Sequence, residues 1–237
     1  GLSSTENRKF NDKKNRAFIT TQSVKKLKKH LKDWALDPTG WKLSEKNKLY
    51  DISLLDKDEK NYERYKGETF FKERWIKEDG LEQKLIVTYS LKYRDYQRQI
   101  RNKQLERAIK LIETRPTGIK KKNQNDFKRF ISSTNITKDG EVADKAIYSL
   151  DKDVILSEEM FDGFYAVCTN LDDDATEITK INHRRWQIEE CFRILKSEFK
   201  ARPVYLSRDD RIKAHFTTCF LALVLYRYLE KYLGDKF

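Results

Sequence analysis

The stretch that decides the fold is NHRRWQIEECFRILKSEFKARPVY, residues 182–205. Its apolar residues recur at helical spacing, and at about 100° per residue they form one stripe that we expect to be buried. The members of this predicted stripe are Ile181, Ile188, Phe192, Leu195 and Phe199. Glu189 falls at the edge of the stripe, and Glu190 falls on the opposite face. The pattern therefore predicts a helix in which Glu189 is held rigidly enough to meet a ligand, whereas Glu190 faces water.

Two basic residues lie along the same edge of the predicted helix as Glu189. Arg185 precedes it by four residues and Lys196 follows it by two turns, so that a cation, a carboxylate and a cation form a row. Such a row can be an ordinary ion pair between Arg185 and Glu189, worth about 0.3 kcal/mol. It can also be a carboxylate that does chemistry between two cations. Helix spacing alone favours the ion pair.

The chain of 237 residues carries more positive than negative charge. Lysine and arginine together number 50, aspartate and glutamate 38, and the net charge is +12. Such a surface favours a polyanionic partner, because each phosphate that it neutralises releases condensed counterions. The alternative is a basic surface that only keeps the protein in solution. A hydrophobic fraction of 38% indicates a folded chain and argues against a disordered one.

The cysteine and apolar patterns argue against two further classes of protein. The three cysteines lie far apart without a CxxC pair, which argues against a zinc site or a disulfide framework and indicates a reducing compartment. The longest apolar run, residues 216–226, is too short to span a bilayer. We expect this run to form a core helix, and we expect no membrane partner.

The rest of the sequence alternates between strand-like and helix-like patterns. In chain order it predicts a strand at 16–21, a helix at 23–36, strands between 43 and 90, a basic helix at 93–113, a polar basic loop at 114–126, short strands between 127 and 156, a buried strand at 161–170, the quoted helix, and a last amphipathic helix at 211–233. The basic helix and the basic loop could follow a duplex backbone, and an ordinary solvated helix face is the alternative.

From residue 162 to about residue 233 the chain resembles the C-terminal end of insertion-sequence transposases of the DDE class. The signature of these enzymes runs Tyr, two residues, Arg, three residues, Glu, six residues, Lys. Arg185, Glu189 and Lys196 fit this spacing, and the flanking RRWQIEECFRILKSEFKARPVYLSRDDRIKAHF also follows the family's course. Asn182 stands at the position of the tyrosine, which is a departure from the signature.

The resemblance implies an α/β fold, with an incomplete ribonuclease-H-like core and a mostly β insertion. Residues 1–42 would belong to the core after its second catalytic aspartate, residues 43–160 would be the insertion with one long basic helix, and residues 161–237 would carry the glutamate helix and the last helix. Both catalytic aspartates would then lie upstream of Gly1. The start at Gly1, without an initiator methionine, is what we expect of the C-terminal portion of a transposase.

The resemblance also implies a reaction and roles for named residues. The full-length enzyme would carry out metal-dependent phosphodiester cleavage and strand transfer, with Mg²⁺ or Mn²⁺ held by two aspartates and Glu189. Arg185 and Lys196 would contact DNA phosphates, and Arg184 and Arg193 could add to the same surface. Without the upstream aspartates we expect this chain to bind DNA and to be inactive alone.

The implied partners are double-stranded DNA, as transposon ends and target, and either a second copy or a full-length transposase. The implied location is the bacterial cytoplasm, with the nucleoid. Two other interpretations stay open. The chain could be a non-catalytic remnant that binds DNA or inhibits transposase, or a basic module of unrelated function whose last helices match by chance. A Glu189 buried in a closed ion pair would favour the unrelated module.

The other carboxylates and the histidines are interpreted as structural or solvated. Asp162 begins the strand before the quoted helix, and Asp172 to Asp174 form an acidic turn. His30, His183 and His215 have no metal-ligand partner at a useful spacing. None of these residues is predicted to be catalytic.

Overall fold

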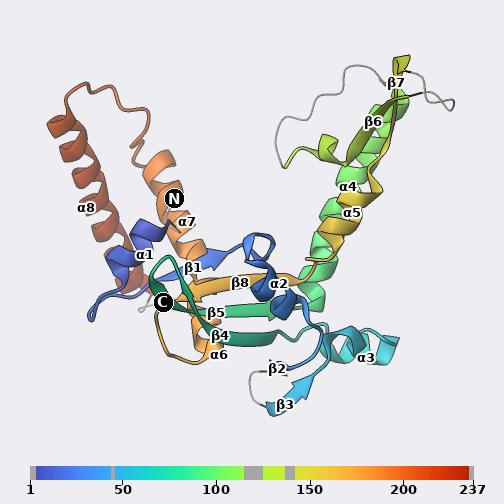
Figure 1. Ribbon diagram of the computed structural model, residues 1–237. Helices are drawn as coiled ribbons and strands as arrows, with labels where there is room; N and C mark the ends of the chain where they lie inside the picture. The colour runs from blue at the N-terminus through green and yellow to red at the C-terminus, as the bar shows by residue number, and fades with distance from the viewer. Residues whose placement is uncertain (1–3, 44–45, 115–124, 137–141, 235–237) are drawn as a thin grey trace. The chain divides into compact units, whose positions relative to one another are not determined.

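The computed structural model describes residues 4–43, 46–114, 125–136 and 142–234. These residues form two compact units, residues 1–175 and residues 176–237, and each unit is described by itself (Figure 1). The fold mixes helices with antiparallel sheet, as the α/β prediction requires. The predicted division of the chain at residues 42 and 160 stays a prediction. The predicted basic loop lies mostly outside the described residues.

The first unit contains most of the secondary structure, including three short 3-10 helices labelled η. Its elements are α1 Thr5–Asn11, β1 Ile19–Gln22, η1 Val24–Lys26, α2 Lys29–Leu36, β2 Trp41–Leu43, β3 Lys46–Tyr50, η2 Ile52–Leu54, α3 Glu59–Tyr65, β4 Phe70–Glu78, β5 Leu81–Tyr89, α4 Leu91–Thr114, η3 Phe127–Phe130, β6 Ile131–Ile136, β7 Val142–Leu150, α5 Lys152–Glu159 and β8 Phe164–Thr169. Helix α6 Ala175–His183 begins where this unit ends, and α7 Arg185–Ser197 and α8 Asp209–Gly234 follow in the second unit.

A six-stranded antiparallel sheet, in the order β1-β8-β5-β4-β2-β3, is the framework of the first unit. The hairpin of β4 and β5 turns at Asp79 and Gly80, whose φ angles are +53° and +76°. These two left-handed residues form a two-residue hairpin turn between Glu78 and Leu81. A turn of this kind matches the right-handed twist of the strands that it connects. The predicted buried strand is β8, which pairs with β1 and β5 and thereby joins both ends of the first unit in one sheet.

Apolar residues from the sheet and from the segments that pack on it form one core. Val24, Leu27 and Leu31, from η1 and α2, are buried in this core together with sheet residues. Trp41 is fully buried, and its indole N–H donates to the carbonyl oxygen of Asp37 at 2.9 Å. This hydrogen bond satisfies the one polar atom of the largest side chain in the core, which is why Trp41 can be buried completely.

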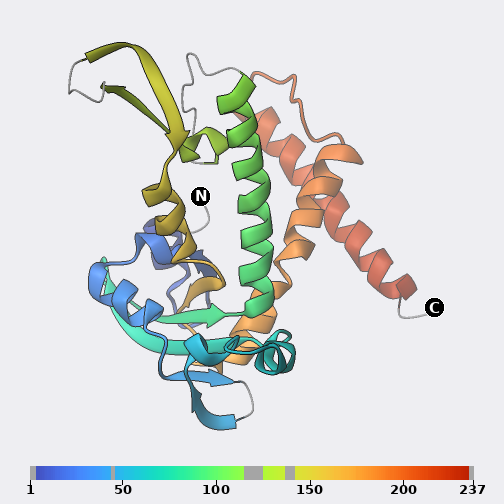
Figure 2. The same ribbon diagram turned by 90° about the vertical axis from the view of Figure 1, so that its right-hand side faces the viewer.

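Helix α4 runs away from the sheet, and the β6–β7 hairpin lies toward its far end (Figure 2). An ion pair of Arg101 and a hydrogen bond from Arg129 fasten the returning chain to α4. The guanidinium of Arg101 makes two hydrogen bonds to the Asp162 carboxylate, at 2.6 and 2.8 Å, with both side chains almost completely buried. Arg129 bonds to Glu158 at 2.7 Å and to Gln104 of α4 at 2.8 Å. Asp162 is therefore structural, as predicted.

Two arginines of the basic helix, which the sequence left open as a DNA-facing or an ordinary solvated helix, are not on its exposed face. The helix itself is confirmed as α4, but Arg94 and Arg101 are both buried. Arg94 bonds to Asp56 at 2.6 Å. Burial acts to lower the pKa of Arg94, but the hydrogen bonds and charges of Asp56, Tyr89 and Asp95 together raise it. These two charges are neutralised inside the unit and are not available to phosphates.

Three local predictions were wrong for identifiable reasons. The predicted helix at 23–36 is two pieces, η1 and α2, because Leu27 has an extended backbone with ψ of 150°. Helix α3 interrupts the first group of predicted strands, and α5 replaces the last of the second group. In each case an aspartate before the helix, Asp58 or Asp151, accepts a hydrogen bond from a backbone N–H of the first turn.

Removal of the buried carboxylate that pairs with Arg101 should destabilise the first unit strongly. We expect Asp162→Ala to lower the free energy of unfolding by about 3–5 kcal/mol, because it leaves a buried guanidinium without its charge partner. Urea denaturation followed by circular dichroism measures the change. The control is Glu63→Ala, which breaks an exposed ion pair with Lys66 and should change stability by less than about 1 kcal/mol. Equal effects of the two substitutions would contradict a structural role for Asp162.

Candidate active-site helix

The quoted stretch forms the end of one helix and the whole of the next. Helix α6 ends at His183, Arg184 stands between the helices without a side-chain cap, and α7 begins at Arg185. The break corrects the prediction of one continuous helix. It leaves Asn182, at the tyrosine position of the signature, on α6, while the other three signature residues lie on α7.

The predicted buried stripe is mostly exposed. Ile181, Ile188 and Phe192 are 47%, 52% and 51% exposed, and the buried residue of α7 is Ile194, at 2%. Within its unit α7 packs against α8, and Leu223 is the buried residue of that partner helix. The stripe was wrongly predicted to be buried, because helical periodicity identifies an apolar face but not whether another element covers it.

The two neighbouring glutamates have different surroundings, and Glu190 is the structural one. Its carboxylate accepts a hydrogen bond of 2.9 Å from the Arg227 guanidinium on α8. The same guanidinium bonds to Glu230 at 2.6 Å and to the Cys191 sulfur at 3.4 Å. The prediction that Glu190 faces water was wrong. Helix α8 approaches α7 on the side that carries Glu190, so Glu190 joins the two helices.

The charges of this ion pair stabilise each other. The hydrogen bond from Arg227 lowers the pKa of the Glu190 carboxyl below its ordinary value. Hydrogen bonds to Glu190, Cys191 and Glu230 in turn raise the pKa of the Arg227 guanidinium. Both groups are thus held in their charged forms near neutral pH, and the contact between α7 and α8 depends on those charges.

Glu189, in contrast, is exposed, and among the residues that the structure describes it makes no hydrogen bond or ion pair. Arg185 and Lys196 are also exposed on α7, one turn before Glu189 and two turns after it. The helix therefore keeps these three residues along one side, as the spacing predicts. A closed ion pair of Glu189, which would have favoured an unrelated basic module, is not formed within the described residues.

The two other predicted phosphate contacts differ from this row. Arg184 is exposed at the break before α7. Arg193 is exposed, but its guanidinium lies 3.6 Å from the Glu190 carboxylate, so part of its charge is already compensated. Arg184 makes no ion pair within the described residues, whereas Arg193 belongs partly to the contact between the helices.

The donor atoms of these residues decide whether they could hold a divalent metal ion. Mg²⁺ requires oxygen ligands in a near-octahedral arrangement, and in proteins one or two carboxylates usually hold it together with waters and substrate phosphates. Glu189 provides one carboxylate. No group of three His, Cys, Asp or Glu side chains suited to a metal occurs in the described part of the chain. The described residues alone do not fit such an ion.

The acidic turn before α6 is anchored in the first unit. The ammonium group of Lys84 lies 3.0 Å from the Asp172 carboxylate and donates to the carbonyl oxygen of Asp173, also at 3.0 Å. The interpretation of this turn as structural is therefore supported. His215 is structural as well, because its Nε2 donates to the carbonyl oxygen of Ala201 at 3.2 Å.

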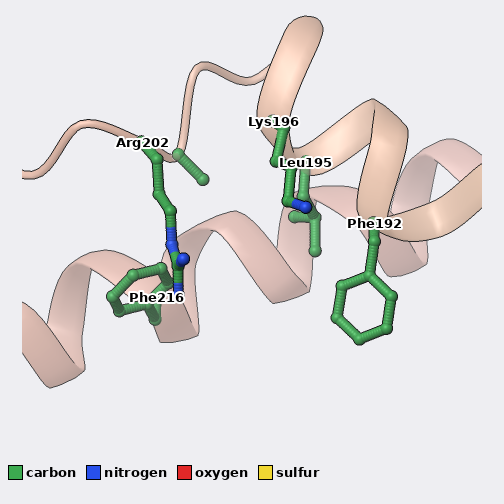
Figure 3. A pocket seen from close by; sticks show the side chains of 6 residues that line it. Phe192, Leu195, Lys196, Arg202 and Phe216 are labelled. Atoms are coloured by element: carbon green, nitrogen blue, oxygen red, sulfur yellow. The ribbon is translucent and has the colours of Figure 1, made fainter. Parts of the chain in front are cut away.

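A pocket of about 460 Å³ lies between the end of α7 and α8, and sequence reasoning missed it (Figure 3). The residues that line it are Phe192, Leu195, Lys196, Ala201, Arg202 and Phe216. The chain leaves α7 through Lys200, whose φ is +48°, and the backbone N–H of Ala201 then donates to the carbonyl oxygen of Leu195 at 2.8 Å. This turn brings Arg202 over α8. No sequence periodicity signals it, because it depends on a left-handed residue that is not glycine.

Helix α8 is much more exposed than a core helix. Of its apolar residues Leu223 is buried, and many large ones are at least 38% exposed: Phe216, Phe220, Leu221, Val224, Leu225, Tyr226, Tyr228, Leu229, Tyr232 and Leu233. Residues 216–226 form part of a helix, as predicted, but the prediction that this helix is buried in a core was wrong. None of the helices described in the structure is long and apolar enough to cross a membrane.

The class of protein to which this helix and the α/β unit belong is shown by comparison with protein families. Residues 8–225 match the family described as the transposase DDE domain. Since the match covers most of the chain, the protein belongs to this family, as the resemblance indicated. Comparisons with curated proteins and with solved structures gave no match.

The two glutamates should respond differently to substitution and to pH. We expect Glu190→Gln to lower the melting temperature at pH 7, because it removes the charged partner of Arg227. The Glu190 carboxyl has a lowered pKa in the folded state, so its stabilising effect is present above about pH 4.5 and disappears as the pH falls through the lowered value. The difference in melting temperature between wild type and Glu190→Gln should therefore be smaller at about pH 3 than at pH 7.

The matched control for this experiment is Glu189→Gln. It removes a carboxylate from the adjacent position, and it should leave the melting temperature unchanged at both pH values. Melting curves followed by circular dichroism at the two pH values compare the three proteins. A loss of stability in Glu189→Gln equal to that in Glu190→Gln would contradict the assignment of different roles to the two residues.

Proposed function

We propose that this chain is the C-terminal portion of a DNA transposase of an insertion sequence. In the complete enzyme Glu189 would supply one carboxylate of the site that cleaves phosphodiesters and transfers strands. The observation that carries the proposal is the exposed Glu189 between exposed Arg185 and Lys196 on α7, in a chain of the DDE transposase family. In this proposal an acidic metal ligand would stand next to cations that suit phosphate.

The chemistry requires more carboxylates than α7 provides. A divalent ion, Mg²⁺ or Mn²⁺, stabilises the attacking and leaving oxygens of phosphoryl transfer in enzymes that use such ions. In this proposal two aspartates upstream of the present sequence supply the remaining carboxylates and complete a ribonuclease-H-like core. Support comes from the exposed apolar side chains of α7 and α8, since helices of a complete core bury such a surface against a sheet.

Within this chain, the role of α7 toward DNA is positioning. Arg185 and Lys196 would bind phosphates on either side of Glu189, with Arg184 and, to a smaller extent, Arg193 at the margins. Phosphate contacts of this kind fix the position of a duplex without reading its sequence. The net charge of +12 supports double-stranded DNA as the partner, in the cytoplasm of a bacterium and in association with its nucleoid.

A second candidate function is inhibition of a full-length transposase by a non-catalytic remnant. The exposed apolar surface of α8 favours it, because a contiguous apolar surface suits a protein partner. That partner would be a second copy of the chain or a full-length transposase. The two functions differ in whether the parent reading frame encodes the two aspartates upstream of Gly1, which sequencing of that DNA decides.

The proposal predicts DNA binding without cleavage for the isolated chain. Supercoiled plasmid should be bound but not nicked in the presence of Mg²⁺ or Mn²⁺, because the chain alone provides one of the carboxylates. Glu189→Gln should bind DNA at least as tightly as wild type, since the substitution removes a negative charge. Agarose gels and fluorescence anisotropy measure the two activities. Nicking by wild type that disappears in Glu189→Gln would instead mean that the chain holds a complete active site.

Salt dependence tests the phosphate contacts. Arg185→Ala and Lys196→Ala should each reduce the steepness of log K against log [salt] by about 0.9, the value for one lost contact to duplex DNA. Lys231→Ala is the control, because Lys231 is an exposed lysine in the last turn of α8 and should leave the slope unchanged. Unchanged slopes for both Arg185→Ala and Lys196→Ala would show that α7 does not face the duplex.

A further inference from the structure

Most of the net positive charge of this chain lies near its beginning. Residues 4–32 contain ten lysines and arginines and two acidic residues, so their net charge is +8, compared with +12 for the whole chain. Residues 33–175, which complete the first unit, have a net charge of −1. The charge that favours a polyanionic partner is therefore concentrated in residues 4–32, which we call the basic segment.

The two halves of the basic segment meet at the turn between β4 and β5. From α1, the Thr5 hydroxyl donates to the Asp79 carboxylate at 3.3 Å. Just before α2, the Lys28 ammonium group lies 3.5 Å from the Glu78 carboxylate. Because Glu78 and Asp79 are neighbours in the chain, the two halves are held beside each other, and their positive charges add to one surface.

Both halves are fixed to the sheet by groups other than their exposed lysines. In the first half, the Arg8 guanidinium donates to the side-chain oxygens of Gln22 on β1 and Gln83 on β5, both at 3.0 Å. In the second half, Leu27 and Leu31 are buried in the core. The remaining cations of the segment are therefore not needed to hold it in place.

Many of these cations are exposed and form no ion pair with any residue that the structure describes. They include Lys9, Lys13, Lys14, Arg16, Lys26 and Lys29. The turn at residues 13–16 brings three of them together, because the backbone N–H of Arg16 donates to the carbonyl oxygen of Lys13 at 2.9 Å. The Arg16 guanidinium and the Lys13 ammonium lie 4.4 and 5.7 Å from the centre of the exposed Phe10 ring. A ring attracts cations without neutralising them, so this turn presents fixed positive charge.

The backbone of a duplex fits this surface better than the other surroundings of a basic protein. Surfaces that only keep a protein in solution intersperse both signs of charge, because like charges close together repel each other. A helix that binds a membrane surface needs an exposed apolar face. In α2, however, the apolar residues Leu31 and Ala35 are buried in the core. The closely spaced phosphates of a duplex neutralise many cations at once and release counterions.

We propose that the basic segment binds the phosphate backbone of duplex DNA through Lys9, Lys13, Lys14, Arg16, Lys26 and Lys29. The proposal rests on the DNA-binding function proposed above and adds to it a second contact surface, which belongs to the first unit. Because phosphate contacts do not read sequence, this surface binds the duplex of a transposon end and the duplex of a target alike.

The salt dependence of binding to a duplex of mixed sequence tests the proposal, measured by fluorescence anisotropy with the full chain. The triple variant Lys13→Gln, Lys14→Gln, Arg16→Gln should reduce the steepness of log K against log [salt] by about 2.7, since each lost contact contributes about 0.9. The double variant Lys26→Gln, Lys29→Gln should reduce it by about 1.8 for the same reason. All five side chains are exposed, so both variants should melt close to the wild-type temperature.

The matched control is the triple variant Lys57→Gln, Lys60→Gln, Arg64→Gln, which removes three exposed cations from α3 and the residues before it. Helix α3 lies at the other end of β4 from the turn that the basic segment contacts (Figure 1). There Tyr65 packs on Phe70, the first residue of β4, with ring centroids 5.9 Å apart. The control loses the same total charge as the first variant and should leave the slope unchanged.

The outcomes separate this inference from the proposed role of α7. Slopes that fall in Arg185→Ala and Lys196→Ala but not in the basic-segment variants would overturn this inference and leave the role of α7 intact. The reverse result would support the basic segment and overturn the role of α7. An equal fall in the α3 control, or tighter binding to phosphatidylglycerol vesicles than to the duplex, would overturn this inference. Absence of binding to the duplex at low salt would overturn both proposals.

Discussion

The ion pair between Glu190 and Arg227 is the interaction on which the candidate site depends. It joins α7 to α8 through one guanidinium that also bonds to Cys191 and Glu230. Because few residues of α7 are buried, this charged contact contributes much of what specifies how the two helices face each other. Glu190 takes part in this ion pair, and Glu189, the residue before it, lies on a neighbouring side of the helix that is exposed to solvent. The two adjacent glutamates thus divide a structural role and a candidate chemical role between them.

The second property of the α7–α8 pair is a surface that exposes both charged and apolar side chains. An exposed carboxylate, two exposed cations, an open aromatic pocket and a long exposed apolar helix all occur in residues 185–234. The polar members suit DNA and the apolar members suit protein, so the same surface is consistent with a catalytic unit that needs both its substrate and the rest of its core. The first unit differs in part, since two of its arginines on α4, Arg94 and Arg101, are neutralised internally by Asp56 and Asp162.

Sequence reasoning predicted elements better than their surroundings. The spacing of Arg185, Glu189 and Lys196, the buried strand β8 and the long helix α4 all follow from periodicity, and the structure has them. The prediction that the α7 stripe and α8 are buried was wrong, because periodicity does not reveal which helix faces another element covers. Glu190 was assigned to water because its partner lies 37 residues away, and the pocket was missed because Arg202 reaches it through a left-handed turn at Lys200.

Chemical-shift mapping of the chain with a short DNA duplex tests the central claim most directly. Backbone amides and arginine side chains would be followed by NMR during a titration at low salt. We predict that the largest chemical-shift changes occur along α7, at Arg185, Glu189 and Lys196. The changes at Arg94 and Arg101, inside the first unit, should be small. Changes confined to the first unit, with α7 unaffected, would contradict the assignment of α7 as the helix that meets DNA.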